Sequence, residues 1–169
     1  QDSRYVGQLI ASWSTRYIDT AAPRELKSAE QIVARLDEGP FVTDIKAGNH
    51  SIVADEPESV GGSDVGPTPY DLVGSGLAAC TLMTMKMYAN RKLWNIRELK
   101  VHVNYDNKYV DDQKNCEDEP QARIGKFERI IEIDGDLEDA QRDKLLAIAD
   151  KCPVHKTLSK GLTIETRIK

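Results

Sequence analysis

The stretch PYDLVGSGLAACTLMTMKMYANRK, residues 69–92, decides how the rest of the chain must fold. Apolar or small side chains occupy almost every face of this helical segment before Lys86. A helix that is apolar all round is buried, so we expect it at the centre of the domain. A sheet would cover one side and a second helix or subunit the other. Close approach of another backbone is favoured by the small residues Gly74, Ser75, Gly76, Ala78 and Ala79.

Three short segments ahead of this helix have the alternating or β-branched pattern of strands. They are EQIVARLD (30–37), FVTDIKAG (41–48) and HSIVADE (50–56). Turn residues separate them, so we expect a meander of antiparallel strands. The following PESVGGSDVGPTP (57–69) has the composition of a loop, and its last proline suits the first turn of a helix.

Two further strands and a second helix follow the central helix. ELKVHVNYD (98–106) alternates, and ARIGKFERIIEIDG (122–135) has the pattern of a long strand. DLEDAQRDKLLAIADKC (136–152) begins with a capping aspartate and predicts a helix, and GLTIETRIK (161–169) predicts a closing strand. The predicted class is α+β, with helices segregated onto one side of antiparallel sheets.

Composition restricts the class of function. The 169 residues suffice for one domain with a real core, and a net charge of -5 argues against a nucleic-acid partner. No apolar run reaches the roughly 18 residues of a membrane span. Three cysteines, an odd and sparse number, are unlike a secreted disulfide scaffold. We therefore expect a cytoplasmic protein with reduced thiols.

The first thirty residues have a different organisation. Tyr5, Leu9, Trp13 and Tyr17 lie at helical spacing, and residues 20–29 have the composition of a linker. A helix ahead of a linker either packs back on the domain or is the end of an upstream domain. We interpret residues 1–19 as such a residual helix and residues 30–169 as the main domain. The chain begins with glutamine rather than methionine, and we expect the native product to be longer.

The segment DKCPVHKTLSKG, residues 150–161, places a cysteine at the start of a short helix. Pro153 is favoured at the first helical position, which makes Cys152 the N-cap. A helix N-terminus can lower the pKa of a thiol from about 8.5 into the range of roughly 3.5–7.5. His155 shares a face with Cys152 and is placed to hydrogen-bond it. The same pattern also fits a buried cap beside a surface histidine.

Cys80 lies in the middle of the central helix, among alanine, leucine and methionine. A cysteine in such surroundings usually packs as a small hydrophobic residue. Reactivity would need a base, an arginine or a subunit boundary nearby, and the local sequence shows none. Taken alone, Cys80 is interpreted as structural.

Taken together, the two cysteine segments resemble the OsmC/Ohr family, the osmotically inducible and organic-hydroperoxide-resistance proteins. GPTPYDLVGSGLAACTLMTMKMYA (66–89) and ADKCPVHKTL (149–158) carry the resemblance, with ADEP (54–57), GG (61–62) and GP (66–67) as subgroup motifs. The likeness covers roughly residues 30–169. It implies an OsmC-like α+β fold in which antiparallel sheets pack on a long central helix. It also implies an intertwined homodimer with its sites at the subunit interface.

The resemblance implies a thiol peroxidase that needs no metal and no other cofactor. Cys80 would attack the O–O bond of an organic hydroperoxide, release the alcohol and become a sulfenic acid. Cys152 would then form a disulfide with it, and an external dithiol would reduce that disulfide. Cys80 and Cys152 are thus the expected catalytic residues.

The sequence departs from the family in the groups that ionise the reactive cysteine. Family peroxidases use an arginine from the loop before the central helix and a glutamate near its start. PESVGGSDVG, residues 57–66, contains no arginine, and Tyr70 occupies the glutamate position with Asp71 next to it. We expect Asp71, Tyr70 and His155 as supporting residues. Cys116, in an acidic loop, is interpreted as an exposed thiol without activation.

Two other functions remain open on the sequence. YVGQLIASWSTRYI (5–18) is similar to the final helix of an α/β-hydrolase domain, which precedes the OsmC-like part in some proteins of this subgroup. The domain could therefore be a non-catalytic dimerisation, small-molecule-binding or redox-sensing module attached to a hydrolase. Metal binding through Cys152 and His155 is a weaker hypothesis, because two ligands are too few for a closed zinc site.

Overall fold

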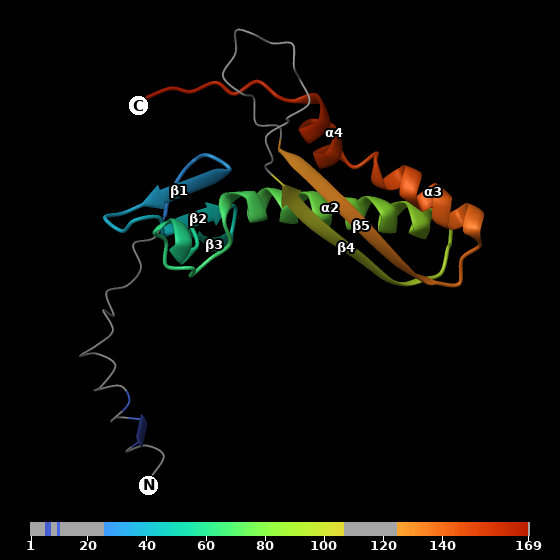
Figure 1. Cartoon of the computed structure of the whole chain (residues 1–169), viewed down its shortest axis with the longest axis horizontal. Helices are drawn as coiled ribbons and strands as arrows, with labels where there is room; N and C mark the ends of the chain where they lie inside the picture. The colour runs from blue at the N-terminus through green and yellow to red at the C-terminus, as the bar shows by residue number, and fades with distance from the viewer. Residues whose placement is uncertain (1–5, 8–9, 11–25, 107–124, 169) are drawn as a thin grey trace.

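The computed structural model describes residues 6–7, 10, 26–106 and 125–168 of the chain. Figure 1 shows a long central helix with a three-stranded sheet at its N-terminal end and a β-hairpin and two helices along its length. The elements in chain order are β1 (Ile32–Leu36), β2 (Thr43–Ala47), β3 (His50–Ala54), a 3-10 turn (Glu58–Val60), α2 (Pro69–Arg91), β4 (Ile96–Asp106), β5 (Lys126–Gly135), α3 (Asp139–Ala149) and α4 (Pro153–Lys160). The predicted α+β class is confirmed.

The N-terminal helix and linker expected over residues 1–29 lie largely outside the described residues. Of the helix, only residues 6, 7 and 10 are described, and all three are helical. The domain boundaries therefore stay a prediction. The acidic loop with Cys116 also lies outside the described residues.

Helix α2 begins where the sequence predicts. Pro69 occupies the first helical position, and Thr68 and Asp71 form a reciprocal capping box. The Thr68 hydroxyl accepts from the Asp71 N–H at 3.2 Å, and the Asp71 carboxylate accepts from the Thr68 N–H at 3.0 Å. In the part of the chain that the structure describes, no helix combines the length and apolarity needed to cross a membrane.

The described residues cover α2 on one side, and the expected cover of its other side by a second helix or subunit stays a prediction. One stripe is buried, consisting of Gly74, Leu77, Thr81, Met85 and Ala89. The opposite side stays open, because Met83 and Met87 are 65% and 69% exposed. The hairpin and the two later helices cover only the first stripe, so the described residues leave an apolar face of α2 uncovered.

The three-stranded sheet confirms the predicted meander. Strands β1, β2 and β3 are hydrogen-bonded in that order and are all antiparallel. Asp55 follows β3 and is only 2% exposed. Its carboxylate accepts the N–H of Glu56 at 2.8 Å, of Ser63 at 2.9 Å and of Val65 at 3.3 Å. This buried carboxylate therefore fixes the loop that leads into α2.

The hairpin of β4 and β5 lies along α2 and brings one face to the core. The two strands pair antiparallel, with Val101 opposite Ile131 and Tyr105 opposite Phe127. The core forms between this hairpin, α2 and α3 and contains Met85, Ala89, Ile96, Leu145 and Ala149. Arg142 of α3 donates to the carbonyl oxygens of Ile133 at 2.7 Å and Gly135 at 3.1 Å, and so fastens α3 to β5.

The closing strand expected over residues 161–169 is not formed. Residues 161–168 have no regular secondary structure, and Leu162, Ile164 and Ile168 are 66%, 79% and 99% exposed. A strand forms only where another strand completes its ladder of hydrogen bonds. None of the described strands pairs with this segment. In Figure 1 it extends away from α4.

Candidate active site

The structure brings together the two cysteines that the sequence singles out. Cys80 lies in the middle of α2, and Cys152 comes directly before α4. Both thiols are free, and their side chains hydrogen-bond each other. Cys152 is fully buried, whereas Cys80 keeps partial access to solvent. Two thiols in contact, one of them reachable, can form and break a disulfide.

Cys152 occupies the position at the start of α4 that its sequence predicts. Pro153 is the first residue of the helix, Cys152 is the N-cap, and Gly161 follows the end with a φ of 75°. The Cys152 carbonyl accepts the N–H of Lys156 at 3.1 Å, and its own N–H donates to Ala149 at 3.2 Å. These two hydrogen bonds fix the backbone on both sides of Cys152, in the loop from α3 to α4.

The surroundings of Cys152 favour its thiolate. Burial raises the pKa of the Cys152 thiol, but hydrogen bonds from Cys80, the N–H groups of His155 and Val154, and Thr81 outweigh burial and lower the pKa. The sulfur makes no capping hydrogen bond of ordinary geometry within the described residues. The N–H groups of the first helical turn nevertheless point their positive ends toward it, as at other helix N-termini.

The pKa of the Cys80 thiol is shifted in the opposite direction. Burial raises the pKa of the Cys80 thiol, and so does its hydrogen bond to Cys152. The N–H of Val154 and the side chain of Thr84 lower it less than these causes raise it. The pKa values of the two thiols are thus shifted apart, and Cys152 is the more acidic of the pair.

A partly buried arginine that the sequence analysis did not identify lies beside the pair. Arg129 of β5 is 12% exposed. Its guanidinium donates to the Thr81 hydroxyl at 2.9 Å, the Ala149 carbonyl at 3.3 Å and the Asp150 carboxylate at 2.7 Å. It also contacts Nδ1 of His155 at 3.1 Å. One side chain therefore ties β5 to α2, to the end of α3 and to α4.

A signal for Arg129 is present in the alternation of β5. Inward-facing positions of this strand carry Phe127, Arg129, Ile131 and Ile133, and outward-facing positions are exposed. A charged residue in the inward register of a strand is buried only if it is paired. The sequence pattern could thus have indicated a buried arginine, although not its partners.

The expected supporting residues lie in different places. His155 is near the thiols, but its ring contacts Arg129, and only its N–H acts on Cys152. Asp71 caps α2, and Tyr70 stacks on Tyr105 with ring centroids 4.2 Å apart. Both precede Cys80 by nine or ten residues, which is about 14 Å along a helix axis. The structure does not bring these two to the thiols of the same chain.

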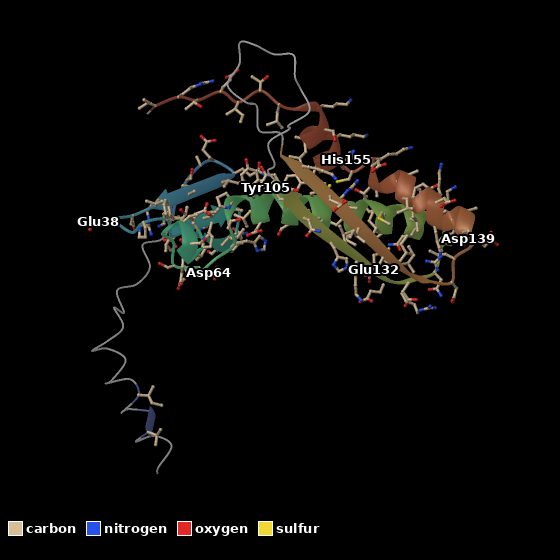
Figure 2. The ribbon with its side chains drawn as sticks, in the orientation of Figure 1. Glu38, Asp64, Tyr105, Glu132, Asp139 and His155 are labelled. Atoms are coloured by element: carbon tan, nitrogen blue, oxygen red, sulfur yellow. The ribbon has the colours of Figure 1, made fainter. Side chains whose placement is uncertain are left out.

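A cavity of about 980 Å³ adjoins this network between β5 on one side and α3 and α4 on the other. Leu77, Ile131, Leu146 and Leu158 give it apolar walls, and Arg129 and His155 supply polar groups. Figure 2 labels His155 on α4, beside β5, and Tyr105 farther along the hairpin toward the start of α2. The described residues that line the cavity include neither cysteine.

A metal centre finds no support in the geometry. Within residues 26–106 and 125–168, no three histidine, cysteine, aspartate or glutamate side chains gather as a metal would need. The hypothesis of a metal held by Cys152 and His155 therefore has no third ligand among the described residues. The chemistry that the arrangement can perform is thiol and disulfide chemistry.

Fold and site together define a class of protein: a small α+β domain whose central helix meets the start of a late helix through two thiols. The chain belongs to the OsmC-like protein family, whose model matches residues 61–167. None of the curated proteins matches the chain by sequence. The resemblance seen in the sequence is thus confirmed for this domain, and the fusion to a hydrolase stays a prediction.

Solved structures share the architecture at low sequence identity. An OsmC-like protein from Mycoplasma pneumoniae is 23% identical with a TM-score of 0.62, over 79% of this chain and 89% of that one. A putative osmotic stress induced and detoxification response protein from Psychrobacter arcticus is 19% identical with a TM-score of 0.62, over 78% and 90%. An organic hydroperoxide resistance protein from Legionella pneumophila is 18% identical with a TM-score of 0.56, over 78% and 91%. These likenesses establish the fold.

Proposed function

We propose that the protein reduces organic hydroperoxides through Cys80 and Cys152. The hydrogen bond between the two thiols carries this proposal, because a peroxidase of this type must bring its second sulfur to the first after oxidation. Family membership and a neighbour described as an organic hydroperoxide resistance protein support it. The apolar walls of the adjoining cavity suit the organic part of such a substrate.

Cys80 is the attacking residue in this proposal because it is the thiol that solvent reaches. Its sulfur attacks the terminal oxygen of the hydroperoxide, the O–O bond breaks, and the alkoxide leaves as the alcohol. The hydrogen bond to the Cys152 thiolate offers a path for the proton of Cys80. Cys80 becomes a sulfenic acid, and the substrate is reduced by two electrons.

Cys152 completes the cycle. Its thiolate attacks the sulfenic sulfur of Cys80 and the S–OH bond breaks as the disulfide forms. The hydroxide that leaves takes a proton from solvent and becomes water. An external dithiol then reduces that disulfide and is itself oxidised. The sum is one hydroperoxide and one dithiol converted into one alcohol, one water and one oxidised dithiol.

The test is dithiol-dependent reduction of cumene hydroperoxide and tert-butyl hydroperoxide by the purified chain. We expect Cys80→Ser to abolish turnover. Cys152→Ser should form the sulfenic acid once but should not form the internal disulfide, which trapping with dimedone and mass spectrometry can distinguish. Cys116→Ser is the matched control and should keep full turnover. Unchanged hydroperoxide consumption by Cys80→Ser contradicts the proposal.

A redox-sensing module is the second candidate, and the full burial of Cys152 favours it. A sensor would form the Cys80–Cys152 disulfide once per oxidant and would be reduced slowly. Stoichiometric oxidation without multiple turnovers at saturating dithiol identifies this function. Many turnovers per chain identify the peroxidase.

We also propose that two copies associate through the uncovered face of α2, the methionine face. It consists of Val73, Gly76, Ala79, Met83 and Met87, spaced at three and four residues on one side of the helix. A continuous apolar stripe of this kind is characteristic of an interface. A homodimer in the cytoplasm, fused behind a hydrolase domain in the native product, is the context proposed for the site.

A further inference from the structure

We propose that Arg129 is the positioning residue of the thiol pair, holding the segments of Cys80 and Cys152 in contact and supplying a positive charge beside them. The inference rests on the proposed function for its biological purpose, but its chemistry concerns only the two thiols. The family's activating arginine precedes the central helix, and residues 57–66 here contain none. Arg129 instead belongs to β5, after that helix.

Arg129 connects the segments that carry the two cysteines. Arg129 donates to the hydroxyl of Thr81, the residue that follows Cys80, at 2.9 Å. It also donates to the carbonyl of Ala149 at 3.3 Å, and the N–H of Cys152 donates to that same carbonyl at 3.2 Å. The guanidinium therefore binds the side chain next to Cys80 and a carbonyl that also accepts from the Cys152 N–H. It thereby connects the two segments whose thiols are in contact.

Arg129 also acts through its positive charge. A guanidinium keeps its charge at every accessible pH, and a nearby positive charge favours a thiolate. Thr81 is fully buried and lies between the two groups: its hydroxyl accepts from Arg129, and its side chain is among the neighbours that lower the pKa of the Cys152 thiol. The Thr81 hydroxyl also donates to the Leu77 carbonyl at 2.7 Å, which fixes its orientation in α2.

The charged and titratable groups around Arg129 come from four elements. Asp150 follows α3 and pairs with Arg129 while its side chain is 65% exposed, so solvent screens the pair. His155 of α4 receives a hydrogen from the guanidinium on Nδ1 and so carries its own proton on Nε2. Asp106 of β4 and Lys126 of β5 line the adjoining cavity. Of these four groups, Asp150 and His155 contact the guanidinium directly and hold it in place.

The test uses a Cys116→Ser background, in which the thiol pair holds the remaining cysteines of the chain. The rate of alkylation by iodoacetamide is measured against pH for Arg129→Met and Arg129→Lys. We expect Arg129→Met to move the midpoint of the profile to higher pH and to slow alkylation at neutral pH roughly tenfold, since tenfold corresponds to one pKa unit. Arg129→Lys keeps the positive charge but loses the planar, forked set of N–H donors. The midpoint of its profile should therefore lie between those of wild type and Arg129→Met.

Arg97→Met is the matched control. Arg97 lies on the same hairpin and pairs with Asp134 at 2.7 Å and Asp136 at 2.9 Å, but its side chain is 53% exposed on the outer face. The Arg97→Met variant should therefore have the same alkylation profile as wild type. Thr81→Val should reproduce part of the Arg129→Met effect, and Thr81→Ser, which restores the hydroxyl, should reverse it.

An unchanged alkylation profile in folded Arg129→Met overturns the inference. If that variant does not fold, as circular dichroism would show, unchanged profiles in Arg129→Lys and Thr81→Val overturn it equally. The outcome is separable from the fate of the proposed function. A wild-type chain that shows no peroxidase turnover, with an Arg129-dependent profile, would reject the activity and keep the role of Arg129.

Discussion

Cys80 and Cys152 share one hydrogen bond between their sulfurs, and the bond acts on their acidities in opposite directions. It raises the pKa of Cys80 and lowers the pKa of Cys152. The asymmetry follows from position, because Cys152 begins a helix whose first N–H groups point toward its sulfur, whereas Cys80 lies in the middle of a helix. The buried thiol is therefore the more acidic of the two, and the thiol that solvent reaches is the less acidic.

Removing either partner should expose this asymmetry. In Cys80→Ser the hydroxyl is a poorer partner for the thiolate, so the pKa of Cys152 should rise, because burial then meets less opposition. In Cys152→Ser the pKa of Cys80 should fall toward its ordinary value, because a principal cause of its increase is gone. Thiolate ultraviolet absorbance against pH, in a Cys116→Ser background, measures both. Shifts of the two pKa values in the same direction would contradict the opposite effects assigned to the shared hydrogen bond.

The loop between β3 and α2 provides a prediction on stability and pH. Burial raises the pKa of the Asp55 carboxyl, but the N–H groups of Glu56, Val65 and Ser63 outweigh burial and hold the pKa below its ordinary value of 3.8. A carboxyl whose pKa is lowered by folding stabilises the folded state above 3.8, and this contribution is lost as the pH falls through the lower folded value.

Asp55→Asn should therefore lower the urea midpoint by the same amount at every pH from neutral to about 5, and the difference from wild type should shrink below that. Urea unfolding across a pH series measures it. Asp64→Asn, in the same loop, is the control, because Asp64 is exposed with a φ of 54° that asparagine adopts readily. A difference from wild type that persists undiminished in acid would rule out the carboxylate as its source.

Glycines in and near this loop are predicted to differ sharply in their tolerance of alanine. A Cβ at Gly62 would overlap the backbone carbonyl of Glu56, which cannot move without opening the loop. At Gly39, nothing in the described part of the chain lies within 4 Å of such a Cβ. Gly62→Ala should lower the free energy of unfolding by on the order of 1–3 kcal/mol, as at other overpacked sites. The melting temperature should fall by several degrees.

Gly39→Ala should change stability little, or raise it by about 0.4–1 kcal/mol, because it reduces the freedom of the unfolded chain. Thermal unfolding followed by circular dichroism compares the two variants directly. Equal melting temperatures for Gly62→Ala and Gly39→Ala would show that the loop yields to the added methyl group.

Much of the fold follows from local sequence because it depends on local interactions. The capping box at Thr68 and Asp71, the proline after Cys152 and the alternation of β1 to β3 act within a few residues. Each of these features places its element within a residue or two of its observed bounds. The position of Cys152 at a helix N-terminus, half of the candidate site, was predictable for the same reason.

The other half of the candidate site depends on contacts between segments that are distant in the sequence. The partners of Arg129 come from α2, α3 and α4, and no local pattern specifies which of them its side chain meets. Asp71 was expected as a supporting residue from its place in a motif, but its carboxylate binds the Thr68 N–H and caps the helix. The closing segment alternates like a strand, and its exposed Ile164 shows that alternation without a partner edge is not enough.

The methionine face of α2 provides the last prediction. Met83 and Met87 are 65% and 69% exposed in the single chain, and an interface there would bury both. Met83→Glu would place a charge in that interface, so association should weaken roughly tenfold or more, equivalent to about 1.4 kcal/mol or above. Sedimentation velocity over a concentration series measures the dissociation constant. Leu93→Lys is the control, because Leu93 lies beyond the end of α2, is 92% exposed, and should leave association unchanged. A wild-type chain that stays monomeric at high concentration, or a Met83→Glu variant that associates as tightly as wild type, would exclude this face as the dimer interface.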